Sequence, residues 1–90
     1  MILTVDKSDM NYTSLVLLVD SVIVDGIPIK NCVYVDTVSG KYICYTDPLR
    51  VVNGRSLTEE KYAGKIEVTF KGSQDLIDYY LDEINNKIQN

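Results

Sequence analysis

The stretch from Ile27 to Arg50, IPIKNCVYVDTVSGKYICYTDPLR, decides the fold of this chain. Its two segments of alternating apolar side chains, Ile27–Asp36 and Lys41–Thr46, flank the short connector Thr37-Val38-Ser39-Gly40. Alternation with a period of two is typical of strands, and a four-residue connector that contains glycine joins antiparallel neighbours. The stretch therefore predicts a β-hairpin, whose second strand ends at Asp47-Pro48 because proline cannot donate to a ladder.

The alternation also predicts which side chains share a face of the hairpin. In the first strand we expect Ile27, Ile29, Val33 and Val35 on one face and Lys30, Cys32, Tyr34 and Asp36 on the other. In the second strand we expect Tyr42 and Cys44 on one face and Ile43 and Tyr45 on the opposite one.

Further strands are predicted before the hairpin. Met1–Val5 alternates weakly and predicts a first strand. Thr13–Val24 is rich in Val, Leu and Ile and predicts either one long bent strand or two short ones, with a bulge or tight bend near Asp20. Asp25-Gly26 then supplies a two-residue turn, and Pro28 suits the start or the edge of the strand that follows.

After the hairpin, residues 47–64 predict a long connection with its own turn at Asn53-Gly54. Connections of this length are often functional or mobile. Lys65–Lys71 predicts a strand with Ile66, Val68 and Phe70 pointing inward.

The chain ends in a predicted helix. Gly72 breaks the preceding strand, and Ser73 supplies an N-cap oxygen. Asp75 and Asp78 lie near the positive end of the helix dipole, and Lys87 lies near the negative end. One apolar stripe at helical spacing comprises Leu76, Ile77, Tyr80, Leu81, Ile84 and Ile88. Residues 1–90 are thus expected to form one α+β domain, an antiparallel sheet of four to five strands with one C-terminal α-helix.

The charge of the chain limits its partners. A net charge of −4 argues against general charge-driven nucleic-acid binding, which comes from Lys and Arg displacing phosphate counterions. Residues 50–71 are an exception, with five basic side chains against three acidic ones. The start of the chain lacks a signal peptide, and its longest apolar run is far too short for a membrane span, so we expect a cytoplasmic protein without membrane contact.

The chain lacks residues that several kinds of catalytic and metal-binding site require. The chain has no histidine, which removes Ser-His-Asp and Cys-His catalysis and all His-containing metal sites. Cys32 and Cys44 are interpreted as two small buried hydrophobes, and a zinc site would need a dimer to supply four thiolates. We therefore expect no catalytic residue, no metal, no cofactor and no small-molecule substrate.

Tyrosine is unusually frequent, with seven residues, and Tyr34, Tyr42 and Tyr45 cluster in the hairpin. Tyrosines on an open sheet can stack on nucleic-acid bases. They can equally anchor a protein interface, or simply pair across strands within the sheet. The sequence leaves these three interpretations open.

The segments IPIKNCVYVDTVSG, KYICYTDPLR and KIEVTFKGSQDLIDYYLDEI follow one another in an order that resembles the SpoVG family of small bacterial nucleic-acid-binding regulators. The resemblance covers about residues 15 to 84 and is one of topology. In the family, a Met-Pro-Ser segment followed by basic residues ends the strand after the connector; this chain has Thr46-Asp47-Pro48-Leu49-Arg50 there. The resemblance implies nucleic-acid binding by a dimer whose chains exchange strands.

The sequence thus predicts a non-enzymatic regulatory binder that acts as a homodimer. In the leading hypothesis, Arg50, Arg55, Lys61 and Lys65 touch the phosphates of a nucleic acid. The alternative is a protein-binding adaptor, or a phage-type inhibitor of a host enzyme. It would contact its partner through Tyr34, Tyr42 and Tyr45 and through an acidic helix face formed by Asp75, Asp78 and Asp82.

Overall fold

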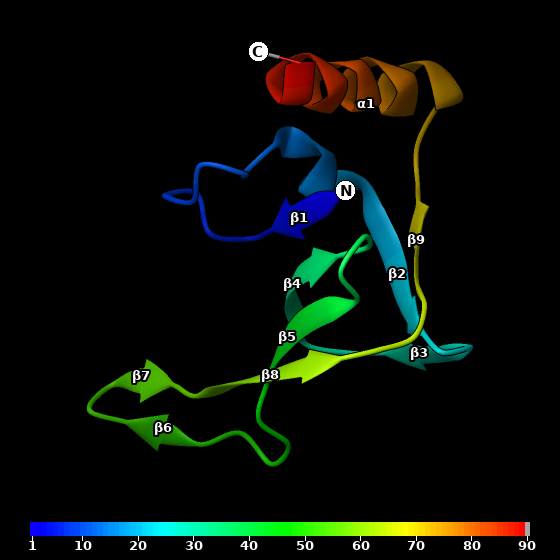
Figure 1. Ribbon diagram of the computed structural model, residues 1–90. Coiled ribbons are helices and arrows are strands. Elements are labelled where there is room, and N and C mark those ends of the chain that lie inside the picture. The colour runs from blue at the N-terminus through cyan, green and yellow to red at the C-terminus, as the bar shows by residue number, and fades with distance from the viewer. Residues whose placement is uncertain (90) are drawn as a thin grey trace.

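The structure is a computed structural model that describes residues 1–89 and, at the C-terminal end, side chains as far as residue 84. It consists of antiparallel sheets and one C-terminal helix, so the predicted α+β class is confirmed. The strands form a four-stranded sheet, a three-stranded sheet and a small two-stranded arm (Figure 1).

The four-stranded sheet has the order β1-β4-β5-β8. Its strands are β1 (Ile2–Thr4), β4 (Cys32–Asp36), β5 (Lys41–Tyr45) and β8 (Thr58–Tyr62), and every pair is antiparallel. The predicted hairpin is the β4–β5 pair, and the predicted first strand is β1. The inclusion of β8 corrects the expectation that residues 47–64 are a long connection with only a turn at Asn53-Gly54. All five of its side chains are exposed, so backbone pairing with β5 holds this strand and no apolar alternation marks it.

The three-stranded sheet has the order β3-β2-β9. It comprises β2 (Val19–Val24), β3 (Ile27–Ile29) and β9 (Ile66–Phe70). The turn at Asp25-Gly26 joins β2 to β3 as predicted, with Val24 opposite Ile27. The bulge predicted near Asp20 is present as well, because the β2–β9 register shifts between Val19 and Ser21.

The prediction of strand is wrong for the first half of Thr13–Val24. Residues Ser14–Leu18 form the 3₁₀ helix η1, in which Leu15 is completely buried while the side chain of Leu17 is 67% exposed. An unbroken apolar run carries no period-two signal, so tertiary packing decides its conformation. Here that packing is against the C-terminal helix.

The expectation of one strand over Ile27–Asp36 is also wrong. Asn31 adopts a φ of 62°, in the left-handed region that asparagine tolerates better than most residues. The chain turns there, so β3 and β4 belong to different sheets. The single alternating pattern therefore spans two strands.

The helix α1 (Gln74–Gln89) begins as predicted, because the Oγ of Ser73 accepts a hydrogen bond from the N–H of Leu76 at 3.3 Å. Of the predicted stripe, Ile77 and Ile84 are buried, but Leu76 is exposed. Two predicted positions, Lys87 and Ile88, have side chains that lie outside the described residues.

The core lies between the two sheets and is closed by η1 and α1 (Figure 1). Every layer contributes buried side chains to it, namely Leu3, Leu15, Val22, Val24, Val35, Ile66 and Ile84. In the part of the chain that the structure describes, no helix is long and apolar enough to cross a membrane.

Candidate nucleic-acid interface

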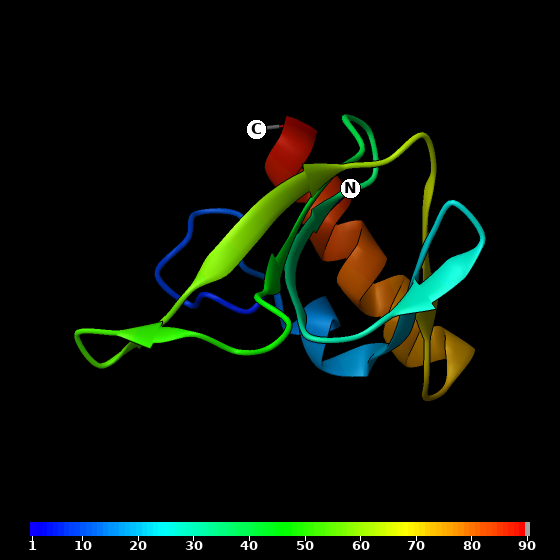
Figure 2. The ribbon, with the colours of Figure 1, turned by 90° about the horizontal axis from the view of Figure 1, so that it is seen from below.

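A two-stranded arm projects beyond the end of β8 (Figures 1 and 2). It consists of β6 (Val51–Val52) and β7 (Arg55–Ser56), which pair antiparallel. Its turn is the predicted Asn53-Gly54, with φ values of 52° and 75°. Two successive positive φ values are the mark of the type I′ turn that suits the twist of a hairpin.

Thr46 fixes the base of the arm. Its buried hydroxyl accepts the N–H of Arg50 at 2.9 Å, and its own N–H donates to the carbonyl of Leu57 at 3.2 Å. The N–H of Leu57 in turn donates to the carbonyl of Arg50 at 2.8 Å. The two chain segments that enter and leave the arm are therefore both tied to the end of β5.

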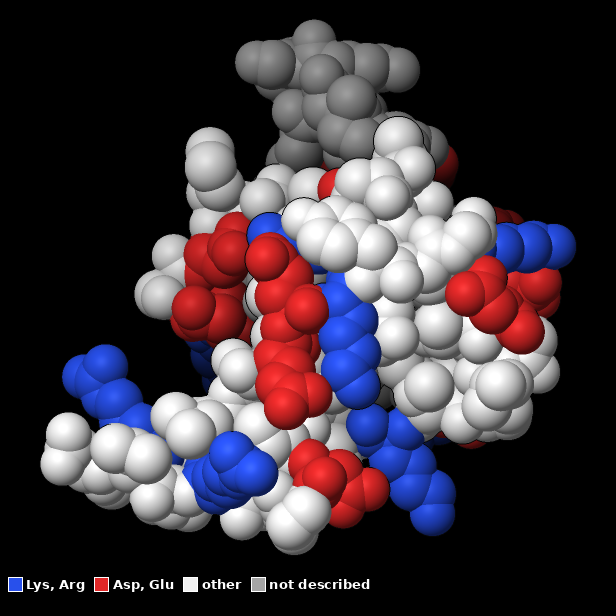
Figure 3. All heavy atoms as spheres, turned by 60° about the horizontal axis from the view of Figure 1, so that its bottom comes forward, with Lys and Arg blue, Asp and Glu red and all other residues white. Residues whose placement is uncertain are grey.

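The pairing of the arm decides which side chains share a face. Val52 lies opposite Arg55, and the backbone hydrogen bond places Arg50 opposite Leu57. Because side chains alternate between the faces of a ribbon, both arginines share one face with these two apolar residues. We call this set, Arg50, Val52, Arg55 and Leu57, the arginine face. Figure 3 shows basic side chains standing out from an otherwise uncharged arm.

The four predicted phosphate contacts do not form one cluster. Lys61 lies on β8, where its Nζ is 3.7 Å from an oxygen of Glu59. Lys65 precedes β9 in the other sheet, and its Nζ is 3.0 Å from an oxygen of Glu67. Arg50 and Arg55 make no ion pair with any described residue. The structure therefore brings the two arginines together as free cations and leaves the two lysines apart.

The three tyrosines predicted as an interface are divided between the faces of the four-stranded sheet. Tyr42 lies opposite Val35 and packs against the core. Tyr34 lies opposite Ile43 on the other face, which Tyr45 also shares. Only Tyr34 and Tyr45 are thus available on the outer face of the sheet.

Sequence reasoning missed Tyr62 on this outer face. It lies opposite Lys41, and its side chain is 68% exposed. Lys41 Nζ is 2.7 Å from Glu60 and 5.4 Å from the centre of the Tyr34 ring. The hydrogen bond to Glu60 raises the pKa of Lys41 above its ordinary value. Tyr62 joins the group only through the β5–β8 pairing, which the sequence does not signal.

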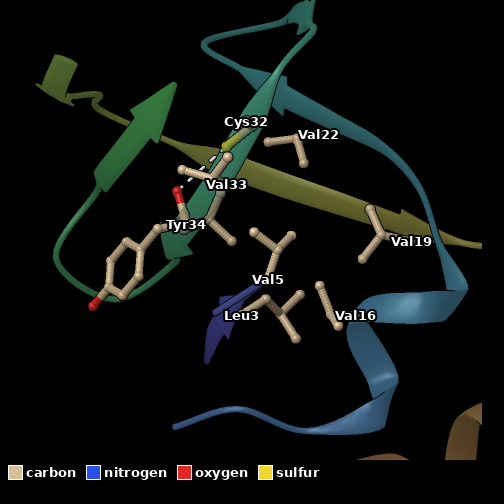
Figure 4. Close-up of a pocket in the computed structure, with 9 residues that line it drawn as sticks. Leu3, Val5, Val16, Val19, Val22, Cys32, Val33 and Tyr34 are labelled. Atoms are coloured by element: carbon tan, nitrogen blue, oxygen red, sulfur yellow. Dashed lines mark hydrogen bonds between the residues drawn. The ribbon is translucent and has the colours of Figure 1, made fainter. Parts of the chain in front are cut away.

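Cys32 and Cys44 are direct cross-strand partners, and both are free thiols. Burial, and then the neighbouring Cys44, raise the pKa of Cys32 to about 11. The Cys32 thiol also donates to the Tyr34 carbonyl at 3.3 Å (Figure 4). A thiol held neutral in this way is a poor nucleophile, because the thiolate is the reactive species.

The Cys32 side chain lines a small cavity between the sheets, with a volume of about 120 Å³ (Figure 4). Its walls are almost wholly aliphatic and include Leu3, Val16 and Val22. Within the described residues, no group of three or more Cys, Asp or Glu side chains is arranged to hold a metal ion. The lining of the cavity thus offers apolar contacts and few polar groups that could bind a ligand.

Comparison with known proteins returns no match: no family model, no curated protein and no solved structure matches this chain. The resemblance to the SpoVG family therefore stays a prediction.

Proposed function

We propose that this protein is a small, non-enzymatic regulatory binder that acts as a homodimer and contacts nucleic acid through its arm. The observation that carries this proposal is the arginine face. Arg50 and Arg55 are exposed, free of ion pairs among the described residues, and held on a ribbon that projects from the body. Guanidinium groups bind phosphate in bidentate geometry and carry their charge at every physiological pH.

The shape of the arm supports contact with a duplex. A two-stranded ribbon fits the major groove of DNA, which is about 12 Å wide. Val52 and Leu57 on the arginine face would meet sugars and base edges between the phosphate contacts. Glu59 and Glu60 on the adjoining β8 would repel phosphates, so contact would be confined to the arm.

Only two arginines of each arm would contact phosphates, so binding to nucleic acid should be weak and strongly salt-dependent. Each neutralised phosphate contributes about −0.9 to the slope of log K against log salt, which gives about −2 per arm and about −4 for a dimer. The net charge of −4 weakens binding further. The two free thiols accord with a reducing compartment, and we propose that the protein acts in the cytoplasm.

A gel-shift series with duplex DNA and RNA at low and moderate salt tests the proposal. The variant Arg50→Ala plus Arg55→Ala should lose most of the shift. The matched control, Lys7→Ala plus Lys30→Ala, removes the same charge from exposed positions outside the arm and should retain it. No shift at low salt, or equal loss in both variants, would contradict nucleic-acid binding through the arm.

A second function, binding to a protein target as an inhibitor or adaptor, is favoured by the apolar exposure of the arm. Leu49 and Val51 are both 58% exposed, and Val51, which pairs with Ser56, lies on the face of the arm opposite the arginine face. Exposed apolar groups gathered on one projection commonly mark a protein interface. Capture of a partner that survives nuclease treatment and is abolished by Val51→Asp would support this function over the first.

A further inference from the structure

The outer strand β8 has one unpaired edge. Two hydrogen bonds flank β8: the N–H of Ala63 donates to the Gly40 carbonyl, and the Leu57 carbonyl accepts from the N–H of Thr46. The backbone groups of Leu57 and Ala63, both odd-numbered, therefore point toward the side of β5. Alternate residues of a strand direct their N–H and C=O groups to opposite edges. The outward groups therefore belong to the even-numbered residues, Thr58, Glu60 and Tyr62. Within the described chain no strand lies beyond this edge (Figure 2).

The arm leaves this edge open as well. In β7, Arg55 pairs with Val52, and the N–H of Leu57 reaches Arg50, so β6 lies on the same side of the segment as β5. The whole run from residue 55 to 62 thus presents one continuous free edge. Such an edge is a template for another strand.

We propose that this edge pairs with the same edge of a second copy of the chain, antiparallel, with the two-fold axis at Glu60. In this register Glu60 exchanges two backbone hydrogen bonds with the partner's Glu60. Thr58 and Tyr62 exchange theirs with the partner's Tyr62 and Thr58. The two four-stranded sheets then join into one continuous antiparallel sheet with β8 at its centre.

The charges of β8 select this register. Glu59 faces the partner's Lys61, and Lys61 faces the partner's Glu59, at positions without mutual hydrogen bonds, where opposed side chains lie closest. An axis at Glu59 or at Lys61 would instead oppose like charges at such a position. At the Glu60 axis the two central carboxylates are like charges too, but each is already bound to its own Lys41 at 2.7 Å.

The tyrosines of the outer face support the same pairing. Tyr62 would lie beside the partner's Thr58, which is itself paired with the partner's Tyr45 within its own sheet. Two exposed rings, of Tyr62 and the partner's Tyr45, would thus flank a small threonine and cover its methyl group. Two such clusters form, one on each side of the two-fold axis.

This inference rests on the homodimer of the proposed function and assigns its surface, but it does not require nucleic-acid binding. A five-residue edge buries less than the roughly 1,000 Å² of a stable interface, so the dimer should depend on concentration. Sedimentation velocity at several protein concentrations would therefore show a shift from monomer to dimer. The arm variants used in the gel shift should dimerise normally, because both arginines lie outside the five residues that pair in this register, Thr58–Tyr62.

Charge exchange within β8 tests the register. Glu59→Lys alone or Lys61→Glu alone opposes like charges twice in the dimer and should weaken association about tenfold. The double exchange, Glu59→Lys with Lys61→Glu, restores two attractive pairs and should recover the wild-type dissociation constant. Thermal melts of each variant serve as the control, because these side chains are exposed and their exchange should leave the monomer folded.

A backbone variant tests the edge itself. Thr58→Pro removes an N–H that points outward and spares the ladder to β5, so the variant should fold but not dimerise, whereas Thr58→Ala should dimerise. A dimer that persists unchanged in Thr58→Pro and in Glu59→Lys would overturn the edge pairing while leaving a dimer formed elsewhere. A wild-type chain that stays monomeric up to about 500 µM would overturn both the pairing and the dimer.

Discussion

Gly40 and Ala63 meet where the β4–β5 connector passes the end of β8. The N–H of Ala63 donates to the Gly40 carbonyl at 2.8 Å, and the Ala63 carbonyl oxygen occupies the space that a Cβ at position 40 would need. Gly40 is buried and has a φ of 81°. This contact closes the hairpin against the strand that carries the arm.

Gly40→Ala should therefore be strongly destabilising. A left-handed backbone costs an ordinary residue about 1–2 kcal/mol, and the clash with a backbone carbonyl adds about as much again, so we expect a loss of roughly 3 kcal/mol. Gly54→Ala is the matched control, because its φ is 75° but its Cβ would meet open space. Urea unfolding of both variants should show a clearly larger loss at position 40. Equal losses would mean that the Ala63 contact is easily relieved.

Leu15 is expected to dominate the stability of η1. Its side chain is completely buried in the core, so Leu15→Ala should lower the free energy of unfolding by about 3 kcal/mol. Leu17→Ala, two residues later on the exposed side of the same helix, should change it by no more than about 0.5 kcal/mol. The measurement is chemical denaturation followed by circular dichroism. Similar values for both variants would contradict the packing of η1 against α1.

The arm should be the least protected paired segment. All of its residues are exposed and its ladder is two residues long on each strand, so its amides should open locally without unfolding of the body. Native-state hydrogen exchange should show fast exchange in β6 and β7 and slow exchange in β2, where Val22 and Val24 are buried. Equal protection of arm and body would indicate that another surface covers the arm.

Sequence patterns predicted those features of the fold that depend on local chemistry. The turns at Asp25-Gly26 and Asn53-Gly54, the Ser73 cap and the bulge at Asp20 each follow from residue types within a few positions. Apolar and polar residues alternate in β9 because only one face of this strand is buried, and the sequence shows this pattern directly. Such local signals predict structure well where the conformation that the residue types prefer is also the one that the fold requires.

The features that the sequence missed depend on pairing between distant residues. β8 reads Thr-Glu-Glu-Lys-Tyr, and only its ladder with β5 makes it a strand and brings Tyr62 beside Lys41. The candidate site shows the same limit. The basic segment was found from composition, but the selection of Arg50 and Arg55 over Lys61 and Lys65 follows from ion pairs formed in the folded chain.

The raised pKa of Cys32 predicts a loss of stability at alkaline pH. Burial first, and the neighbouring Cys44 second, move this pKa from 9.0 to about 11 in the folded chain. Between these two values the unfolded chain loses the thiol proton and the folded chain keeps it, so the free energy of unfolding falls as pH rises. Well below pH 9 both states hold the proton, so Cys32 then makes no pH-dependent contribution to the free energy of unfolding.

The experiment compares urea unfolding of the wild type and Cys32→Ala across this range of pH. The informative quantity is the difference between the two chains, because contributions that both chains share cancel in it. The wild type should lose more stability than Cys32→Ala as pH rises from 9 toward 11. Cys44→Ala should lose less stability than the wild type over this range, because it removes the second cause of the raised Cys32 pKa. Parallel pH profiles in all three proteins would show that Cys32 ionises normally in the folded chain.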